Sequence, residues 1–293
     1  GHYFIIDRKK DIYKNSRGQT IAPQKIENLF QDFDAIKSIF LVGDGKEFNT
    51  VLIYPDYKNS PLDLQVSNNE EVRDFFSSMI LSVNSFLSPF ERIVNYAIIN
   101  RNFSKKKGEI THKGTFIRNQ IITNFNKIIE PLYEKNYISL YHNSNEIRIP
   151  NWLTREIGTV KNNIFWNGRI LSITDQPKAL LLNWSEDSVQ IGDYIYETNS
   201  QLIDLELFIQ YPLLWLGNSH FSNFVGDSIF RLKEPKQYGS IKLLKANLVV
   251  PKEQNLIIDN GETVLHHIHK AVYLYLLNDS STFNIISSII DNG

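Results

Sequence analysis

The sequence predicts an α+β protein, and three observations support that prediction. In the first 135 residues, strand-like apolar runs stand between segments with the 3.6-residue periodicity of amphipathic helices. Hydrophobic residues make up 42% of the chain, which is ample for a packed core. Beyond about residue 145 the apolar runs are short and bounded by turn residues, which indicates mostly β structure. We therefore expect a small α+β domain over 1–140 and a mostly β domain with a helical end over 141–293.

The elements expected in the first domain come in a mixed order. They are a short apolar run at 3–6, a helix from Pro23, strands at 36–42 and 50–54, a helix from Asn68 or Asn69 to Pro89, a strand at 95–99 and a helix through 117–132. Proline suits the first turn of a helix because its missing N–H would be unpaired there anyway. The stretch Gly43-Asp44-Gly45 is a strong turn signal between two strands.

The second half differs in composition and contains all four tryptophans. The polar stretch 142–146 is interpreted as a linker between the domains. Strands are expected at 169–174, 178–183, 189–197 and 241–250, with a helix near 262–277. Asp193, Asp204 and Asp227 stand in turn-like contexts, where they are expected to cap or close local structure.

Composition excludes several classes of function. The chain has no cysteine, so disulfides and thiol catalysis are excluded. Its net charge of −1 gives no indication of nucleic acid as a partner. No signal peptide is visible and no apolar run approaches the roughly 20 residues of a membrane span, so a cytoplasmic location is expected. The chain starts at Gly1 with Met79 as its single methionine, and we expect a fragment open at both ends.

Most of the functional information lies in residues 7–27, where Asp7-Arg8-Lys9-Lys10-Asp11 is followed by Lys14, Gly18 and Ile21-Ala22-Pro23. This segment resembles the D-R-K-K-D-x-x-K-x-x-x-G-x-x-I-A-P-x-x-I-E pattern of long-chain acyl-CoA synthetases, which are adenylate-forming ligases. In that family it joins a large ATP-binding domain to a small mobile lid. The resemblance implies that Arg8 binds the ribose of the nucleotide, that Lys10 is the hinge, and that Lys14 and Gly18 belong to the loop lining the pantetheine tunnel.

A second segment, Gly108-Glu109-Ile110-Thr111 with Arg118, resembles the family's G-E-L-T-P-T-x-K-x-x-R. That motif carries the lysine essential to adenylation, whose ammonium neutralises the carboxylate and the α-phosphate as they meet. Here the position of that lysine is Thr115, and Lys113 lies two residues earlier. We expect Lys113 to be the catalytic lysine, acting from a flexible loop; the alternative is that the activity is impaired. The resemblance covers about residues 1–137.

The resemblance implies a fragment of a long-chain fatty acid–CoA ligase that forms an acyl-adenylate from ATP and then an acyl-CoA. The large N-terminal domain, which would also bind Mg²⁺ with ATP, is expected to be missing, so the fragment alone should be inactive. Peripheral association of the intact enzyme with a membrane is compatible with this function.

Three alternatives stay open. The ligase could load a carrier protein in place of coenzyme A. The lid could be a non-catalytic interaction module, as Thr115 would suggest. Residues 145–293 could be an independent domain that binds a protein or a ligand.

A metal site is not expected. His266-His267-Ile268-His269 has the residue type of a zinc ligand set, but the surrounding apolar residues form an amphipathic helical pattern that explains the segment without metal. Trp215 to His220 places a serine beside a histidine, but adjacency in sequence is not the geometry of a catalytic triad. Structural roles are expected for both segments.

Overall fold

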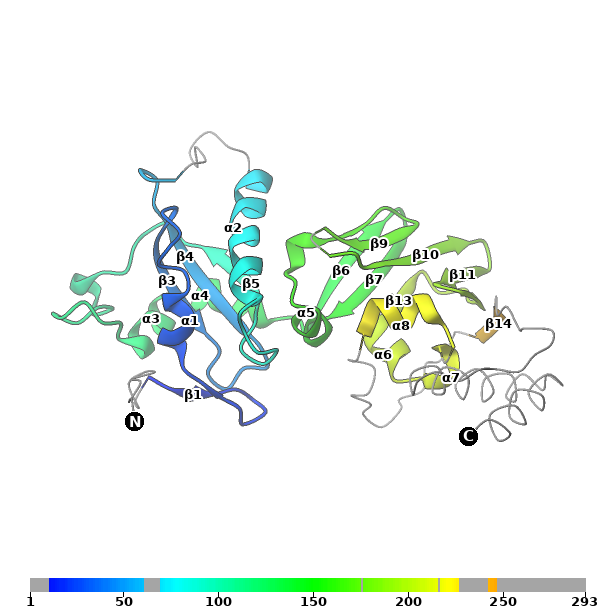
Figure 1. Cartoon of the computed structure of the whole chain (residues 1–293), viewed down its shortest axis with the longest axis horizontal. Helices are drawn as coiled ribbons and strands as arrows, with labels where there is room; N and C mark the ends of the chain where they lie inside the picture. The colour runs from blue at the N-terminus through cyan, green and yellow to red at the C-terminus, as the bar shows by residue number, and fades with distance from the viewer. Residues whose placement is uncertain (1–10, 61–68, 175, 216, 227–241, 247–293) are drawn as a thin grey trace, which may run out of the picture. The chain divides into compact units, whose positions relative to one another are not determined.

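The computed structural model describes residues 11–60, 69–174, 176–215, 217–226 and 242–246 (Figure 1). Helices and strands are mixed in it, so the α+β prediction is confirmed. The chain divides into two compact units with borders at 138/139, 148/149 and 164/165. Residues 149–164 therefore belong to the first unit and residues 139–148 to the second. A single border at 140/141 does not describe this division.

The first unit contains the following elements: β1 Tyr13–Lys14, β2 Thr20–Ile21, α1 Pro23–Asn28, β3 Ile36–Val42, β4 Asn49–Pro55, α2 Asn69–Asn84, β5 Ile93–Ile98, η1 Lys105–Lys107, α3 Arg118–Asn124, α4 Asn126–Tyr133, α5 Asn151–Ile157 and η2 Lys161–Asn163. Pro23 occupies the first turn of α1, as its sequence context predicts. Strand β3 has the bounds expected from its apolar run.

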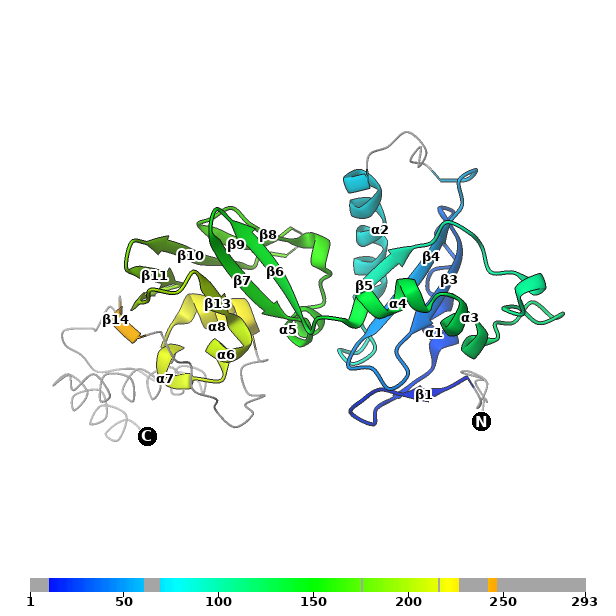
Figure 2. The ribbon, with the colours of Figure 1, turned by 180° about the vertical axis from the view of Figure 1, so that it is seen from behind.

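A three-stranded sheet of order β3-β4-β5 separates two apolar cores. Successive residues of a strand point to opposite faces, so Ile39 and Leu41 pack on the side of α1 and α2, while Phe40 and Val42 pack on the side of α3 and α4. Figures 1 and 2 show α2 and α4 on opposite faces of this sheet. Burial on both faces explains why β3 and β4 are nearly continuous apolar runs.

The single helix expected over 117–132 is two helices. Phe125 ends α3 and precedes α4 with a non-helical backbone, at φ −106° and ψ 13°. Its ring is buried against Phe103, with centroids 5.5 Å apart. Both helices bury apolar side chains in the same core, so the periodicity continues across the break and conceals it.

The interpretation of 142–146 as a linker is wrong, because this stretch is the turn of a β-hairpin. Strand β6 (Tyr137–His142) and strand β7 (Asn145–Pro150) flank Asn143 and Ser144. Asn143 has a φ of 51°, the left-handed conformation that asparagine tolerates and short hairpin turns require. The polar residues therefore mark a tight turn.

Helix α5 belongs to the first unit because two arginines attach it there. Arg92 donates to the carbonyls of Arg155 and Glu156, at 3.1 and 2.6 Å. These carbonyls lie in the last turn of α5, where a cation is favourable. Arg155 is 1% exposed and donates to the carbonyl of Glu47 at 2.9 Å. Both contacts join positions more than 60 residues apart, so local sequence does not reveal them.

The second unit contains the β6–β7 hairpin and mostly short strands: β8 Ile164–Trp166, β9 Ile170–Ile173, β10 Ala179–Ser185, β11 Ser188–Ile191, β12 Tyr194–Glu197, β13 Leu202–Asp204, α6 Leu205–Ile209, α7 Pro212–Trp215, α8 Ser219–Val225 and β14 Lys242–Ala246. One sheet has the order β14-β12-β11-β10-β9-β8, and a smaller one has the order β13-β7-β6. The expected strand 189–197 is the β11–β12 hairpin. The helix expected near 262–277 lies outside the described residues.

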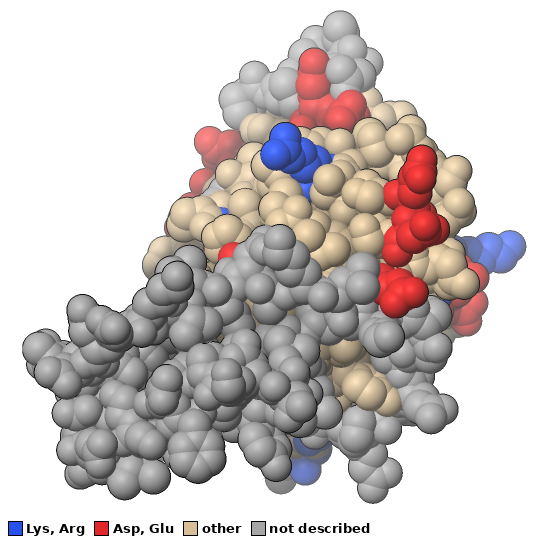
Figure 3. Space-filling model, turned by 90° about the vertical axis from the view of Figure 1, so that its right-hand side faces the viewer, with Lys and Arg blue, Asp and Glu red and all other residues tan. Residues whose placement is uncertain are grey.

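Local polar contacts in the second unit are structural. Asp204 caps α6 by accepting from the backbone N–H groups of Glu206 and Leu207, as expected. Asn218, fully buried, accepts from the backbone of Phe221 and caps α8. Asp193 accepts from the backbone of His220 at 3.0 Å. On the face drawn in Figure 3, acidic side chains gather in separate groups with uncharged residues between them.

Candidate functional site

Two of the residues expected to act, Arg8 and Lys10, lie outside the described residues. The described chain begins at Asp11, immediately after the expected hinge. Lys14, Gly18 and Lys113 are described, and they occupy two different loops. Figures 1 and 2 place the β1–β2 hairpin and the loop that precedes α3 on separate sides of the unit. The structure therefore does not bring Lys113 together with Lys14 and Gly18.

The loop between β1 and β2 is organised by Asn15. Its Oδ1 accepts from the backbone N–H groups of Arg17 and Gln19, at 3.0 and 2.9 Å. Gly18 has a φ of 78°, a left-handed conformation that costs a residue with a side chain about 1–2 kcal/mol. No atom would lie within 4 Å of a Cβ at Gly18. The space beside this glycine is open, so a ligand could approach its backbone closely.

The same hairpin is fixed to the turn between β3 and β4. The backbone of Gly45 donates to Lys14 O and the backbone of Ser16 donates to Lys46 O, both at 2.9 Å. The hydroxyl of Tyr13 donates to Asn49 Oδ1 at 2.8 Å, and burial raises the pKa of this hydroxyl, so it remains a donor. A loop held by this many long-range hydrogen bonds presents Lys14 on a fixed support.

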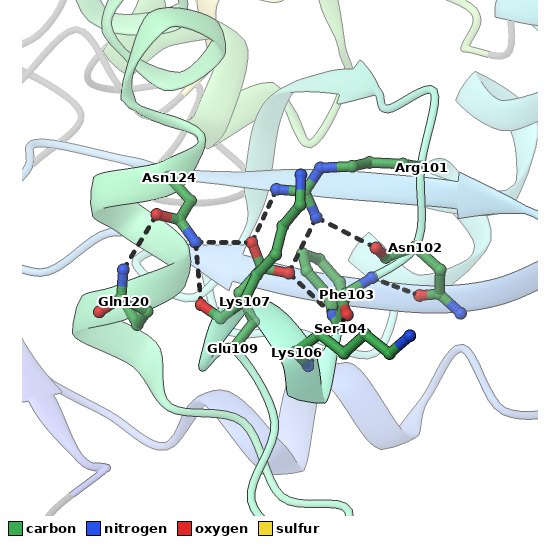
Figure 4. Close-up of polar contacts among 9 residues, drawn as sticks. All are labelled: Arg101, Asn102, Phe103, Ser104, Lys106, Lys107, Glu109, Gln120 and Asn124. Carbon is green, nitrogen blue, oxygen red and sulfur yellow. Dashed lines mark hydrogen bonds and ion pairs between the residues drawn. The ribbon is translucent and has the colours of Figure 1, made fainter.

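The loop that carries Lys113 is held at its base by a buried carboxylate (Figure 4). Glu109 has no exposed surface, and its carboxylate accepts hydrogen bonds from both terminal nitrogens of the Arg101 guanidinium, at 2.7 and 2.8 Å. It also accepts from the Ser104 backbone and from Asn124 Nδ2, both at 2.8 Å. Burial opposes ionisation, but these donors outweigh it and lower the pKa of Glu109 to about 2. The Glu of the G-E motif is therefore a brace for the loop.

The tip of this loop is a tight turn between Thr111 and Thr115. Thr111 donates through its backbone to Thr115 O at 2.8 Å, and the two hydroxyl oxygens are 2.7 Å apart. Thr115, at the position of the family's lysine, thus closes the turn with its hydroxyl. Lys113 is exposed at the tip, next to Gly114 with a φ of 82°. Among the described residues Lys113 has no hydrogen-bond or ion-pair partner.

Two further motif residues form one ion pair. Arg118 donates to Glu27 Oε1 at 2.6 Å and to the carbonyl of Leu41 at 3.0 Å. Glu27 Oε1 also accepts from the backbone of Leu41 at 2.8 Å. The pair therefore fixes α1 and α3 to the edge strand β3. These contacts give Glu27, the last residue of the 7–27 segment, a structural role.

A pocket of about 320 Å³, lined by polar and apolar surface in nearly equal parts, lies beside this ion pair. Four segments line it: Asp11 where the described chain begins, α1 and the residues after it, the first half of β3, and the segment of Gly114, Thr115, Phe116 and Arg118. Thr115 lines the pocket and Lys113 does not. The cations in its lining are Arg118 and Lys37, a residue that no sequence motif had indicated.

No group of three or more His, Cys, Asp and Glu side chains suited to a metal ion occurs in the part of the chain that the structure describes. The histidines at 266–269 are outside that part. Within the same part, no helix combines the length and apolar character that a membrane span requires.

Comparison with known proteins finds similarity in the region that carries these loops. Residues 10–137 match the family described as AMP-binding enzyme C-terminal domain. Long-chain-fatty-acid--CoA ligase 6 of Homo sapiens is 30% identical over 142 residues, which cover 44% of this chain and 20% of the ligase. Long chain acyl-CoA synthetase 3 of Arabidopsis thaliana is 27% identical over 145 residues, which cover 45% of this chain and 22% of the synthetase. The chain thus matches about a fifth of the length of these relatives.

Among solved structures, the A-PCP didomain of carboxylic acid reductase from Segniliparus rugosus in complex with AMP is similar to 44% of this chain and 18% of its own. The sequence identity is 18% and the TM-score is 0.38. The matches to the family and to the ligases confirm the resemblance of the first unit that its motifs indicate.

Proposed function

We propose that this chain is the mobile C-terminal part of an AMP-forming long-chain fatty acid–CoA ligase. The observation that supports the proposal most directly is the match of residues 10–137 to the C-terminal domain of AMP-binding enzymes, shared with long-chain fatty acid ligases. The large domain that would hold ATP, Mg²⁺ and the fatty acid lies outside this chain. We place the intact enzyme in the cytoplasm, with peripheral membrane association compatible with its substrate.

The proposed reaction has two steps. A carboxylate oxygen of the fatty acid attacks the α-phosphorus of ATP, the bond to the bridging oxygen breaks, and pyrophosphate leaves with the electron pair. The sulfur of coenzyme A then attacks the acyl carbon, and AMP leaves. The separation of the Lys113 loop from the β1–β2 hairpin supports a division of labour in which a different face of the domain serves each step.

Each site residue has a proposed role in these steps. Arg8 would hold the ribose hydroxyls of the nucleotide, and Lys10 would absorb the backbone rotation of the hinge. Lys113 would approach the carboxylate and the α-phosphate from its exposed turn. Lys14 and Gly18 would line the passage of the pantetheine arm, for which the open space beside Gly18 leaves room.

The test is isotope exchange between ATP and pyrophosphate in the presence of a long-chain fatty acid. The full-length protein should catalyse exchange, and the 293-residue chain alone should not. Exchange by the chain alone would overturn the proposed division between the domains. Supplying either coenzyme A or a pantetheine-bearing carrier protein to the full-length protein then identifies the acceptor.

A second candidate function is favoured by one observation. The hydroxyl of Thr115 engages Thr111 at the position where the family's lysine is expected, as it would in a lid that had lost catalysis and serves as an interaction module. In that case the full-length protein would bind ATP without exchanging pyrophosphate. The second unit is proposed to be an independent binding domain appended to the lid.

A further inference from the structure

The proposed first step requires positive charge where two anions meet. Lys113, at the exposed tip of a turn, does not supply that charge from a fixed position. A carboxylate and a triphosphate are both anions, and positive charge held in place where they meet lowers the barrier. Such a charge is most effective on a rigid element, because it then needs no reorganisation during the reaction. Lys113 stands on an exposed turn, and the hydroxyl of Thr115 carries no charge.

The pocket beside Thr115 contains two cations, and one of them is already paired. Arg118 bonds to Glu27 and to the carbonyl of Leu41, and its guanidinium lies 4.7 Å from the centre of the Phe40 ring. Lys37 is exposed and forms no hydrogen bond or ion pair with the described residues, although its charge lies close enough to Asp56 to help lower the pKa of that carboxyl. Of the two, Lys37 is therefore the cation available to an incoming anion.

Strand β3 is irregular at Lys37, which is one of the residues that line the pocket. Ile36 pairs with Pro55 and Ser38 pairs with Tyr54, so Lys37 is an extra residue opposite no partner. In a regular strand, the side chain of one residue points to one face of the sheet and those of its two neighbours point to the other face. A β-bulge breaks this alternation and redirects a side chain. Ile36, Lys37 and Ser38 all line the pocket.

The pocket also lies where the described chain begins, because Asp11 lines it. Asp11 directly follows the proposed hinge, so this end of the unit is the one nearest to a preceding large domain. The carboxylates in the lining are Glu27, which Arg118 neutralises, and Asp11. Two carboxylates thus compete for Lys37, Asp11 in the pocket and Asp56 outside it, and a more highly charged triphosphate would displace them.

We propose that Lys37 supplies, from the bulge in β3, a second positive charge for adenylation, acting beside the lysine of the 111–115 turn. This inference rests on the proposed function. It identifies an adenylation residue outside the motif that resembles the family's lysine segment. The step is the attack described above, with the Lys37 ammonium hydrogen-bonded to the oxygens on which negative charge is concentrated.

The experiment measures both half-reactions in the full-length protein. Lys37→Ala should slow ATP–pyrophosphate exchange roughly 100- to 1,000-fold, the usual effect of removing one preorganised charge contact. Thioester formation from added acyl-adenylate should stay within a few-fold of wild type. Lys58→Ala is the matched control, an exposed lysine in the turn after β4 that does not line the pocket, and should leave exchange unchanged.

A rescue variant separates a missing charge from a damaged fold. Thr115→Lys in the Lys37→Ala background returns an ammonium to the same pocket, and it should recover most of the lost exchange. If the wild type exchanges pyrophosphate and Lys37→Ala does so at a rate within a few-fold of it, the role of Lys37 is overturned and the proposed function stands. A wild-type protein without exchange would overturn the proposed function, and the role of Lys37 with it. Equal slowing of both half-reactions by Lys37→Ala, without rescue, would also contradict the proposal.

Discussion

Glu109→Gln removes a buried charge on which the loop carrying Lys113 depends, and its effect can be worked out from the structure. The four donors around Glu109 lower its pKa from 4.5 to about 2. Each pKa unit corresponds to about 1.4 kcal/mol, so ionised Glu109 contributes at most roughly 3 kcal/mol to stability. Because the folded pKa is lowered, this contribution is complete above about pH 4.5 and is lost as the pH falls towards 2.

The assay is urea unfolding of wild type and Glu109→Gln at pH 7 and pH 3, with hydrogen exchange of the peptide spanning 101–117 as a local readout. The two proteins should differ by roughly 3 kcal/mol at pH 7, and the difference should be about 2 kcal/mol smaller at pH 3. Glu130→Gln, at an exposed position of α4, should change stability by no more than about 0.5 kcal/mol. A difference that is the same at both pH values would refute the assignment of the effect to the Glu109 charge.

Three further changes probe the two loops. Lys113→Ala should slow adenylation in the full-length protein roughly 100-fold or more while sparing thioester formation; Lys106→Ala is its control, and equal rates for the two variants would count against Lys113. Gly18→Val should lower the free energy of unfolding by about 1–2 kcal/mol, because it forces a branched residue to a φ of 78°, and should slow thioester formation but not exchange. Thermal unfolding and the two half-reaction assays check it, and normal thioester formation would contradict the role of this loop. Asn49→Ala should lower the free energy of unfolding in urea by about 2–4 kcal/mol, because it leaves the Tyr13 hydroxyl and the Glu91 carbonyl without a partner. A decrease below about 1 kcal/mol would show that water replaces the amide.

The sequence predicts the elements of the first unit well where local signals are unambiguous. The apolar run of β3 and the proline of α1 each have a single structural interpretation, and the structure agrees. The turn at Asn143 is not recognisable from its own residues, because polar residues occur both in linkers and in tight hairpin turns. Only the pairing of the flanking strands distinguishes the two, and pairing is not a local property.

The candidate site divides in the same way. Motif spacing indicates Glu109, Arg118 and Thr115, but not the partners that define what they do. Arg101 reaches Glu109 only because the intervening loop folds back, as the contacts of the Ser104 backbone show. Lys37 carries no motif at all, because a bulge depends on the register between two strands and leaves no mark in either one.

The three borders between the units have a practical consequence for dissecting this protein. A truncated chain that stops at residue 138 would omit α5 and leave the guanidinium of Arg92 without the carbonyls that it binds. A chain that continues to residue 164 would include a hairpin that belongs to the other unit. The residues on either side of the segment 139–148 lie close together, since the backbone N–H of Asn151 donates to the carbonyl of Asn136 at 2.8 Å. Replacing residues 139–148 by a short glycine linker is therefore the truncation that keeps the first unit whole. The removed hairpin is the segment in which the chain leaves the first unit for the second and then returns.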